Sequence, residues 1–105
     1  MFQRVTVVVL DSVGVGDAPD AADYGDLGSA TLQHVAEAVG GLDVPNLEAL
    51  GLGRVADIAG VGVPEAPGAA TGRLTETSAG KDTTTGHWEL MGIVLDRPFP
   101  TYPEG

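Results

Sequence analysis

The sequence predicts an α/β fold whose sheet is incomplete within these 105 residues. The run from Val5 to Leu10 is apolar and mostly β-branched without alternation, which is typical of a parallel strand covered on both faces. The chain offers two or three strand-like segments in all, and the next of them lies at residues 72–76. So few strands cannot build the covered sheet that such a first strand requires.

Helices are predicted between and after these segments. The first follows the helical spacing of four apolar residues, Leu32, Val35, Ala36 and Val39. Ser29 or Thr31 can cap its start, and Gly40 with Gly41 supplies its end. A second, shorter helix is predicted after Asn46, and it ends at Gly51.

The segment from Ala79 to Met91 predicts a polar loop that turns into a third helix. We expect Trp88, Met91 and Leu95 to share its buried face. Residues 60–70 are rich in small residues and predict a loop. Three prolines, Pro98, Pro100 and Pro103, predict an exit linker over residues 98–105, because proline removes donors and blocks regular structure.

Composition narrows the function classes. The chain is 43% apolar and lacks an apolar run of the ~20 residues that a membrane helix needs, so no membrane partner is expected. Its start lacks the features of a secretory signal, which favours the cytoplasm. A formal charge of −10 argues against nucleic acid as a partner, and an anionic small substrate would need metal ions here.

Two residues are candidates for chemistry. Asp11 follows the predicted strand directly, where open α/β sheets place ligand and metal groups, although an aspartate there can also cap a turn. Thr83 lies where a Gly-Lys loop enters a helix, so that N–H groups and the helix dipole would favour a phosphate. Its hydroxyl could be a metal-activated nucleophile, or the threonines at 83–85 could cap the helix.

Two neighbours of Thr83 leave both readings open. Lys81 is either a contact to the substrate phosphate or an ordinary solvated cation. His87 either donates to a phosphate or is satisfied at the helix surface.

Two nucleotide-binding motifs fail on spacing. A P-loop that used Gly80-Lys81 would need glycine at position 75 and serine or threonine at 82, where the chain has Thr75 and Asp82. Gly14-Val15-Gly16 resembles a dinucleotide fingerprint, but Pro19 takes the place of the third glycine. A nucleotide-binding module is therefore a distant alternative.

Longer motifs carry a family resemblance. Asp11-Ser12-Val13-Gly14-Val15-Gly16 and the later Gly80-Lys81-Asp82-Thr83-Thr84-Thr85-Gly86-His87-Trp88-Glu89 resemble the opening and the phosphothreonine loop of the phosphopentomutase family. Pro45-Asn46-Leu47 and Leu50-Gly51-Leu52-Gly53 fit between them, so the similarity runs along nearly the whole chain.

The resemblance implies part of the doubly wound α/β core of the alkaline phosphatase superfamily. Residues 1–97 would be the amino-terminal part of the catalytic metal-binding core, and 98–105 would lead to a cap domain absent from this chain. Asp11 would bind manganese, and Thr83 would be phosphorylated and bridge two metal ions. The family interconverts ribose 1-phosphate and ribose 5-phosphate, and the deoxyribose pair, in the breakdown of nucleosides.

The resemblance also implies that most ligands of the two Mn²⁺ ions, or of other divalent ions, lie outside these residues. We therefore expect a fragment without mutase activity of its own. The alternative is a short, non-catalytic module that binds a sugar phosphate or a nucleotide.

Overall fold

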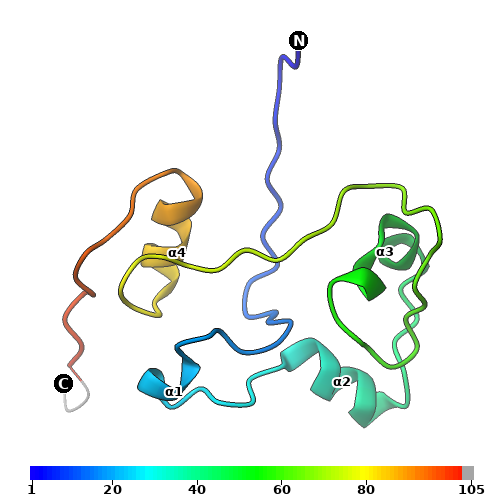
Figure 1. The fold of residues 1–105 in the computed structure, drawn as a ribbon, viewed down its shortest axis with the longest axis horizontal. Helices are drawn as coiled ribbons and strands as arrows, with labels where there is room; N and C mark the ends of the chain where they lie inside the picture. The colour runs from blue at the N-terminus through cyan, green and yellow to red at the C-terminus, as the bar shows by residue number, and fades with distance from the viewer. Residues whose placement is uncertain (103–105) are drawn as a thin grey trace. The chain divides into compact units, whose positions relative to one another are not determined.

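The computed structural model describes residues 1–102, and within this range the regular structure is helical. The helices are α1 (Ala21–Tyr24), α2 (Thr31–Val39), α3 (Pro45–Leu50) and α4 (Thr83–Leu90), and a short 3₁₀ turn, η1 (Leu52–Arg54), follows α3 (Figure 1). No helix in this range combines the length and the apolar character needed to cross a membrane.

The described chain divides into two compact units. The first unit joins Met1–Asp17 to Leu27–Gly72 and contains α2, α3 and η1. The second unit joins Ala18–Asp26 to the described residues from Arg73 onward and contains α1 and α4. Asp11 therefore belongs to the first unit and Thr83 to the second.

The predicted α2 is confirmed, and so is its end. Gly40 takes the left-handed conformation, with φ of 78°, which a glycine adopts at little cost. The predicted caps are wrong, because Ala30 occupies the N-cap position and makes no side-chain cap hydrogen bond. The N–H of Leu32 in the first turn is instead bonded to the Gly14 carbonyl at 3.0 Å, so a neighbouring loop takes over part of the capping.

The first unit has a small apolar core. Ala36 on α2 is fully buried and packs with Ile58 and Val61, which are 2% and 9% exposed. Around them lie partly buried apolar side chains: Val15, Leu32, Leu42, Val44, Leu52 and Ala56. The helical spacing of α2 thus correctly marks the face that carries Ala36, although Val35 and Val39 remain exposed.

Residues 60–70 form the predicted loop, and polar side chains tie it to α3 and η1. Glu48 on α3 accepts the Gly62 N–H at 2.8 Å. The Arg54 guanidinium donates to the carbonyls of Pro64 and Glu65 over distances of 2.7–3.1 Å. α3 itself begins at Pro45, slightly earlier than predicted, because proline at the first helical position gives up an N–H that would have no helical partner.

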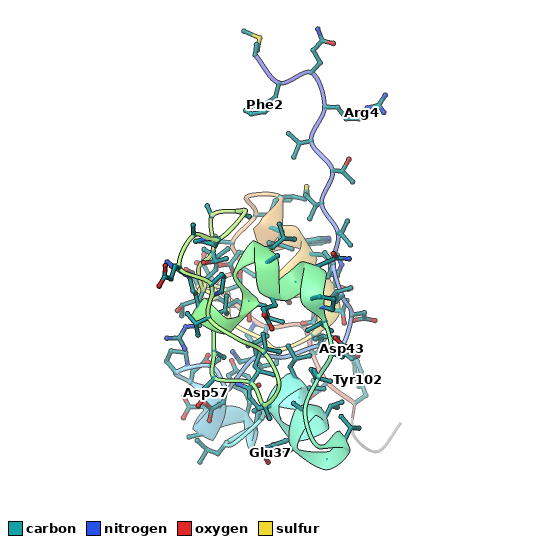
Figure 2. The ribbon with its side chains drawn as sticks, turned by 90° about the vertical axis from the view of Figure 1, so that its right-hand side faces the viewer. Phe2, Arg4, Glu37, Asp43, Asp57 and Tyr102 are labelled. Carbon is teal, nitrogen blue, oxygen red and sulfur yellow. The ribbon has the colours of Figure 1, made fainter. Side chains whose placement is uncertain are left out.

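The predicted strands are not formed in residues 1–102. Val5–Leu10 has no strand partner in the described chain. The exposed fraction of its apolar side chains runs from 48% at Val9 to 81% at Val5. Figure 2 shows Phe2 and Arg4 on the same extended amino-terminal segment, with Phe2 94% exposed. A strand exists only through pairing with other strands, so a correct local pattern does not produce one where neighbours are lacking. Residues 72–76 lack a partner in the same way.

The predicted buried face of α4 is also wrong. The helix ends at Leu90, so Met91 is its C-cap residue and Leu95 lies beyond it. Trp88 is 43% exposed and Met91 is 70% exposed. The residue that α4 buries completely is Thr85, because a hydrogen-bonded polar side chain faces inward here.

The predicted exit segment has no regular secondary structure over residues 98–102, and Pro103 lies outside the described range. This stretch nevertheless packs against α4 within the second unit. The Phe99 ring meets the Trp88 ring edge-to-face at a centroid distance of 5.6 Å. Whether residues 98–105 mark a domain boundary remains a prediction.

Ile58 offers a test of the core. Ile58→Ala removes buried methyl groups next to Ala36 and leaves a cavity, so we expect it to lower the free energy of unfolding by roughly 2–5 kcal/mol. Val63→Ala, at a position 67% exposed, should change it by less than about 0.5 kcal/mol. Denaturant unfolding measures both, and equal effects would contradict the described core.

Candidate functional site

The loop that leads into α4 is ordered by one carboxylate. Asp82 is the N-cap residue, and its two oxygens accept the Thr85 N–H at 2.9 Å and the Thr85 hydroxyl at 2.6 Å. These bonds satisfy a backbone donor that the first turn of a helix leaves unpaired. Hydrogen bonding from the Thr85 side chain, followed by its backbone N–H, lowers the pKa of Asp82.

The cap gives the three threonines of α4 different roles. Thr85 is fully buried, and its hydroxyl is held by Asp82. Thr83 is the first residue of the helix, and both Thr83 and Thr84 are exposed. The hypothesis that all three threonines compete to cap the helix is therefore wrong, since the cap is Asp82.

His87 lies one turn after Thr83 and contacts its backbone. The His87 Nδ1 atom is 2.8 Å from the Thr83 carbonyl oxygen. Because a carbonyl oxygen can only accept, Nδ1 carries the hydrogen, and in the neutral ring Nε2 is then the acceptor. The exposed imidazole thus presents a lone pair rather than an N–H at Nε2, unless the ring is protonated.

The Lys81 ammonium is engaged by acidic groups of its own unit. It lies 2.8 Å from Asp20 Oδ1, 3.7 Å from Glu76 Oε2, and 5.0 Å from the centre of the Tyr24 ring. The hydrogen bond to Asp20 raises the pKa of Lys81, and the same bond lowers the pKa of Asp20. This cation is therefore directed toward the start of α1, where Asp20 is the N-cap residue.

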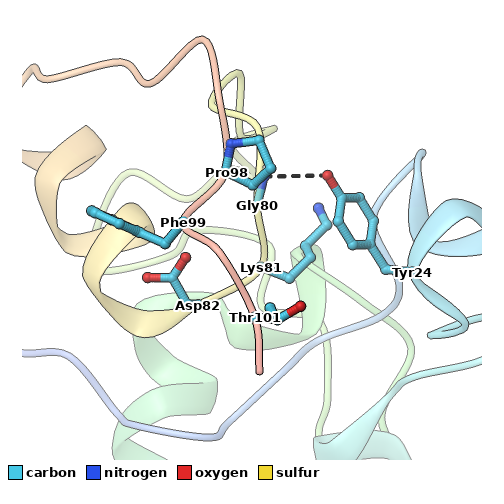
Figure 3. A pocket seen from close by; sticks show the side chains of 7 residues that line it. All are labelled: Tyr24, Gly80, Lys81, Asp82, Pro98, Phe99 and Thr101. Carbon is cyan, nitrogen blue, oxygen red and sulfur yellow. Dashed lines mark hydrogen bonds between the residues drawn. The ribbon is translucent and has the colours of Figure 1, made fainter. Parts of the chain in front are cut away.

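A pocket of about 460 Å³ opens beside the same loop. Its lining consists of Tyr24, Gly80, Lys81, Asp82, Pro98, Phe99 and Thr101 (Figure 3). The Tyr24 hydroxyl accepts the Gly80 N–H at 3.2 Å and so closes one side. Gly80 has a φ of 114°, and a Cβ there would lie 3.3 Å from the Pro98 Cβ, so glycine suits this wall.

Glu89 makes polar contacts that the sequence does not predict. Its two carboxylate oxygens accept the N–H groups of Thr77 and Ser78 at 2.8 and 2.7 Å. Hydrogen bonding from Ser78, followed by that from Thr77, lowers the pKa of Glu89. A bond between a helix and a loop eleven or twelve residues earlier has no periodic signature, so the sequence does not predict it.

Asp11 lies in a tight turn of the first unit. The Val13 N–H reaches the Leu10 carbonyl at 3.4 Å, and Ser12 has a φ of 59°, which is uncommon for a residue other than glycine. Farther along this loop the Asp17 carboxylate accepts the Gly28 N–H at 2.9 Å. Asp11 itself is exposed, in keeping with a ligand role but also with a simple turn.

The predicted site residues are thus grouped in part. Thr83, Lys81 and His87 share one segment of the second unit, whereas Asp11 belongs to the first. Carboxylate and hydroxyl oxygens suit hard divalent cations. However, the described residues contain no group of three or more His, Cys, Asp or Glu side chains that could hold a metal ion.

Comparison with curated proteins finds similar sequences that all bear one enzyme name. The relatives carry the name phosphopentomutase. The chain is 60% identical over 104 residues to the one from Syntrophotalea carbinolica, 55% to that from Herpetosiphon aurantiacus and 52% to that from Desulfitobacterium hafniense. Each match covers 99% of this chain, so the resemblance seen in the motifs is confirmed.

The same matches cover 26–27% of each relative, so the chain spans about a quarter of their length. No model of a protein family matches the sequence.

The two carboxylates that hold the loop, Asp82 and Glu89, give a prediction for acid pH. The ordinary pKa is 3.8 for Asp82 and 4.5 for Glu89, and in the folded state the pKa of each group is lower than its ordinary value. Their contribution to stability is therefore complete above these values and is lost as the pH falls through the lower folded values. An NMR titration of both carboxyl carbons should give midpoints below 3.8 and 4.5, with the Thr85 and Ser78 amide signals shifting in step. A midpoint at or above the ordinary value would show that the bond in question is not formed.

Proposed function

We propose that these residues are part of a phosphopentomutase, which interconverts ribose 1-phosphate and ribose 5-phosphate, and the deoxyribose pair. The observation that carries this proposal is 52–60% identity to phosphopentomutases over 99% of the chain. The catalytic unit would be a polypeptide of the relatives' length, and residues 1–105 alone would be inactive. The setting we propose is the cytoplasm and the breakdown of nucleosides, with no part for nucleic acid or membrane.

In the proposed reaction Thr83 carries the phosphoryl group. The free hydroxyl oxygen of a pentose monophosphate attacks the phosphorus, the bond from phosphorus to Thr83 Oγ1 breaks, and the proton of the attacking hydroxyl ends on Thr83 Oγ1. The bisphosphate then turns, Thr83 Oγ1 attacks its other phosphorus, the bond from that phosphorus to the sugar oxygen breaks, and the proton returns to the sugar oxygen. The exposed position of Thr83 at the start of α4 supports this role, because helix N-terminal N–H groups and the dipole favour phosphate.

Lys81 and His87 are proposed as contacts to the substrate phosphate. His87 has the better support, because it is exposed one turn from Thr83. A phosphate would need a donor at Nε2, so this contact requires the protonated ring. Lys81 would have to leave Asp20 to reach a phosphate, since its ammonium lies 2.8 Å from that carboxylate.

Asp11 and Thr83 are proposed as ligands of divalent cations, with two Mn²⁺ ions as the candidates. Such ions neutralise charge on the transferring oxygens when they are bound. The donor types fit a hard cation, but two oxygen donors are fewer than such an ion requires. The remaining ligands would come from the parts of the relatives' length that this chain does not span.

Substitution of Thr83 tests the phosphoryl carrier. In the protein purified from its own cells, the intact mass should include a phosphoryl group that maps to Thr83. Thr83→Ala should remove this group and lower mutase activity by on the order of 10³-fold or more, as loss of a nucleophile does. Thr84→Ala changes the neighbouring exposed threonine and should leave both nearly unchanged. A phosphoryl group on Thr84, or full activity of Thr83→Ala, would contradict the assignment.

Substitution of Asp11 tests the metal. Asp11→Asn removes a charged oxygen ligand, so the Mn²⁺ concentration for half-maximal activity should rise by at least about 10-fold. Asp57→Asn alters an exposed aspartate in the same unit and serves as the control (Figure 2). Metal content after dialysis gives an independent reading. Equal metal content and equal Mn²⁺ dependence in both variants would exclude Asp11 as a ligand.

A further inference from the structure

Glu89 has a position that helix stability does not explain. It is the penultimate residue of α4, and a carboxylate in the last turn of a helix is disfavoured by the helix dipole. Its two oxygens are instead used outside the helix, on the N–H groups of Thr77 and Ser78. Charge-assisted bonds of this kind, with both oxygens of one carboxylate engaged, are among the stronger polar contacts in proteins.

The bonds from Glu89 fasten the far end of the loop that carries the site. Residues 77 and 78 are held at Glu89, and Asp82 is held at the first turn of α4 through Thr85. The intervening residues 79–81 therefore form a bridge whose two ends are both tied to one helix. Gly80 and Lys81 of this bridge line the pocket.

Other contacts place Ser78 in the interior rather than at a surface. Ser78 is 5% exposed, and its hydroxyl accepts the Leu95 N–H at 3.0 Å. The next residue, Ala79, donates its N–H to the Leu95 carbonyl at 2.9 Å. The Ser78 N–H thus lies in a packed region, where leaving it without a hydrogen-bond partner would cost free energy of folding.

We propose that Glu89 is a positioning residue for the phosphoryl transfer: by accepting hydrogen bonds from Thr77 and Ser78 it fixes the loop 77–82, which leads directly into Thr83 at the start of α4. This inference rests on the proposed function for its catalytic part. Glu89 acts through the loop and does not touch the reacting atoms. Its effect falls on the rate of transfer, because small displacements of positioned groups cost large factors in rate.

The test uses Glu89→Gln in the full-length enzyme, since glutamine keeps the shape but offers one acceptor oxygen instead of two. Exchange of the Thr77 and Ser78 amide hydrogens should be faster by roughly 10-fold or more, as expected for loss of a charge-assisted bond. The kcat should fall roughly 10- to 100-fold with KM nearly unchanged. Because one acceptor oxygen remains, the melting temperature should fall only slightly.

Glu37→Gln is the matched control, because it makes the same chemical change at an exposed glutamate on α2 (Figure 2). If the Thr77 and Ser78 amide hydrogens of Glu89→Gln exchange at the wild-type rate, Glu89 does not hold the loop. Faster exchange with unchanged kcat, or a loss of activity that only follows loss of folded protein, would overturn the positioning role. If the wild-type enzyme shows no mutase activity, the proposed function fails, and the exchange data still decide whether Glu89 holds the loop.

Discussion

The hydrogen bonds between Asp82 and Thr85 are the interaction on which the candidate site depends. They start α4, and they do so with a side chain that precedes the threonines rather than with one of them. As a result, Thr83 is left at the first helical position with an exposed side chain. Had Thr83 been the capping residue, its hydroxyl would have been aimed back at the helix N–H groups and committed to structure.

The cap also explains why an aspartate is tolerated close to a proposed phosphate. Both Asp82 oxygens accept hydrogen bonds from Thr85, so the carboxylate is turned toward the first turn of α4 and its charge is stabilised there. The same aspartate rules out a P-loop, because that motif has serine or threonine at this position and an aspartate there would face the phosphates. One residue therefore separates this loop from the nucleotide-binding loops that Gly80-Lys81 superficially resembles.

Local signals made much of the fold predictable. The apolar spacing of α2 and the glycines at the ends of α2 and α3 act within a few residues, so sequence patterns located these helices well. The strand predicted at Val5–Leu10 depends on partners elsewhere, and the described residues supply none. A strand pattern states what the segment would do beside other strands, not that those strands are present.

The candidate site was predictable to a similar degree. Thr83 stood out through the motif around it, and the structure places it at the start of a helix, as the sequence indicated. The roles of Asp82 and Glu89 were missed for different reasons. Asp82 stands beside three threonines that could also cap the helix, so the sequence alone does not single it out, although aspartate is a common N-cap. Glu89 is bound to residues far away in the sequence, and nothing in its neighbourhood signals that contact.

The charge of the chain limits how a phosphate could be neutralised. Five basic residues oppose fifteen acidic ones, and two of the five are already engaged within the described structure. Arg54 donates to loop carbonyls, and Lys81 is paired with Asp20. The charge balance of these residues therefore supports the divalent cations proposed at Thr83, which would bring positive charge in a compact form.

Different forces stabilise the interior of each unit. The first has an apolar cluster around Ala36 and Ile58. In the second, the deeply buried residues include Ser78 and Thr85. The Ser78 N–H donates to the Glu89 carboxylate, and the Thr85 hydroxyl donates to the Asp82 carboxylate. Apolar packing tolerates changes of pH, whereas bonds to a carboxylate require that the carboxylate stays charged. The geometry of the loop before Thr83 therefore depends on the ionisation of Asp82 and Glu89, which couples the proposed phosphoryl carrier to the charge of two nearby carboxylates.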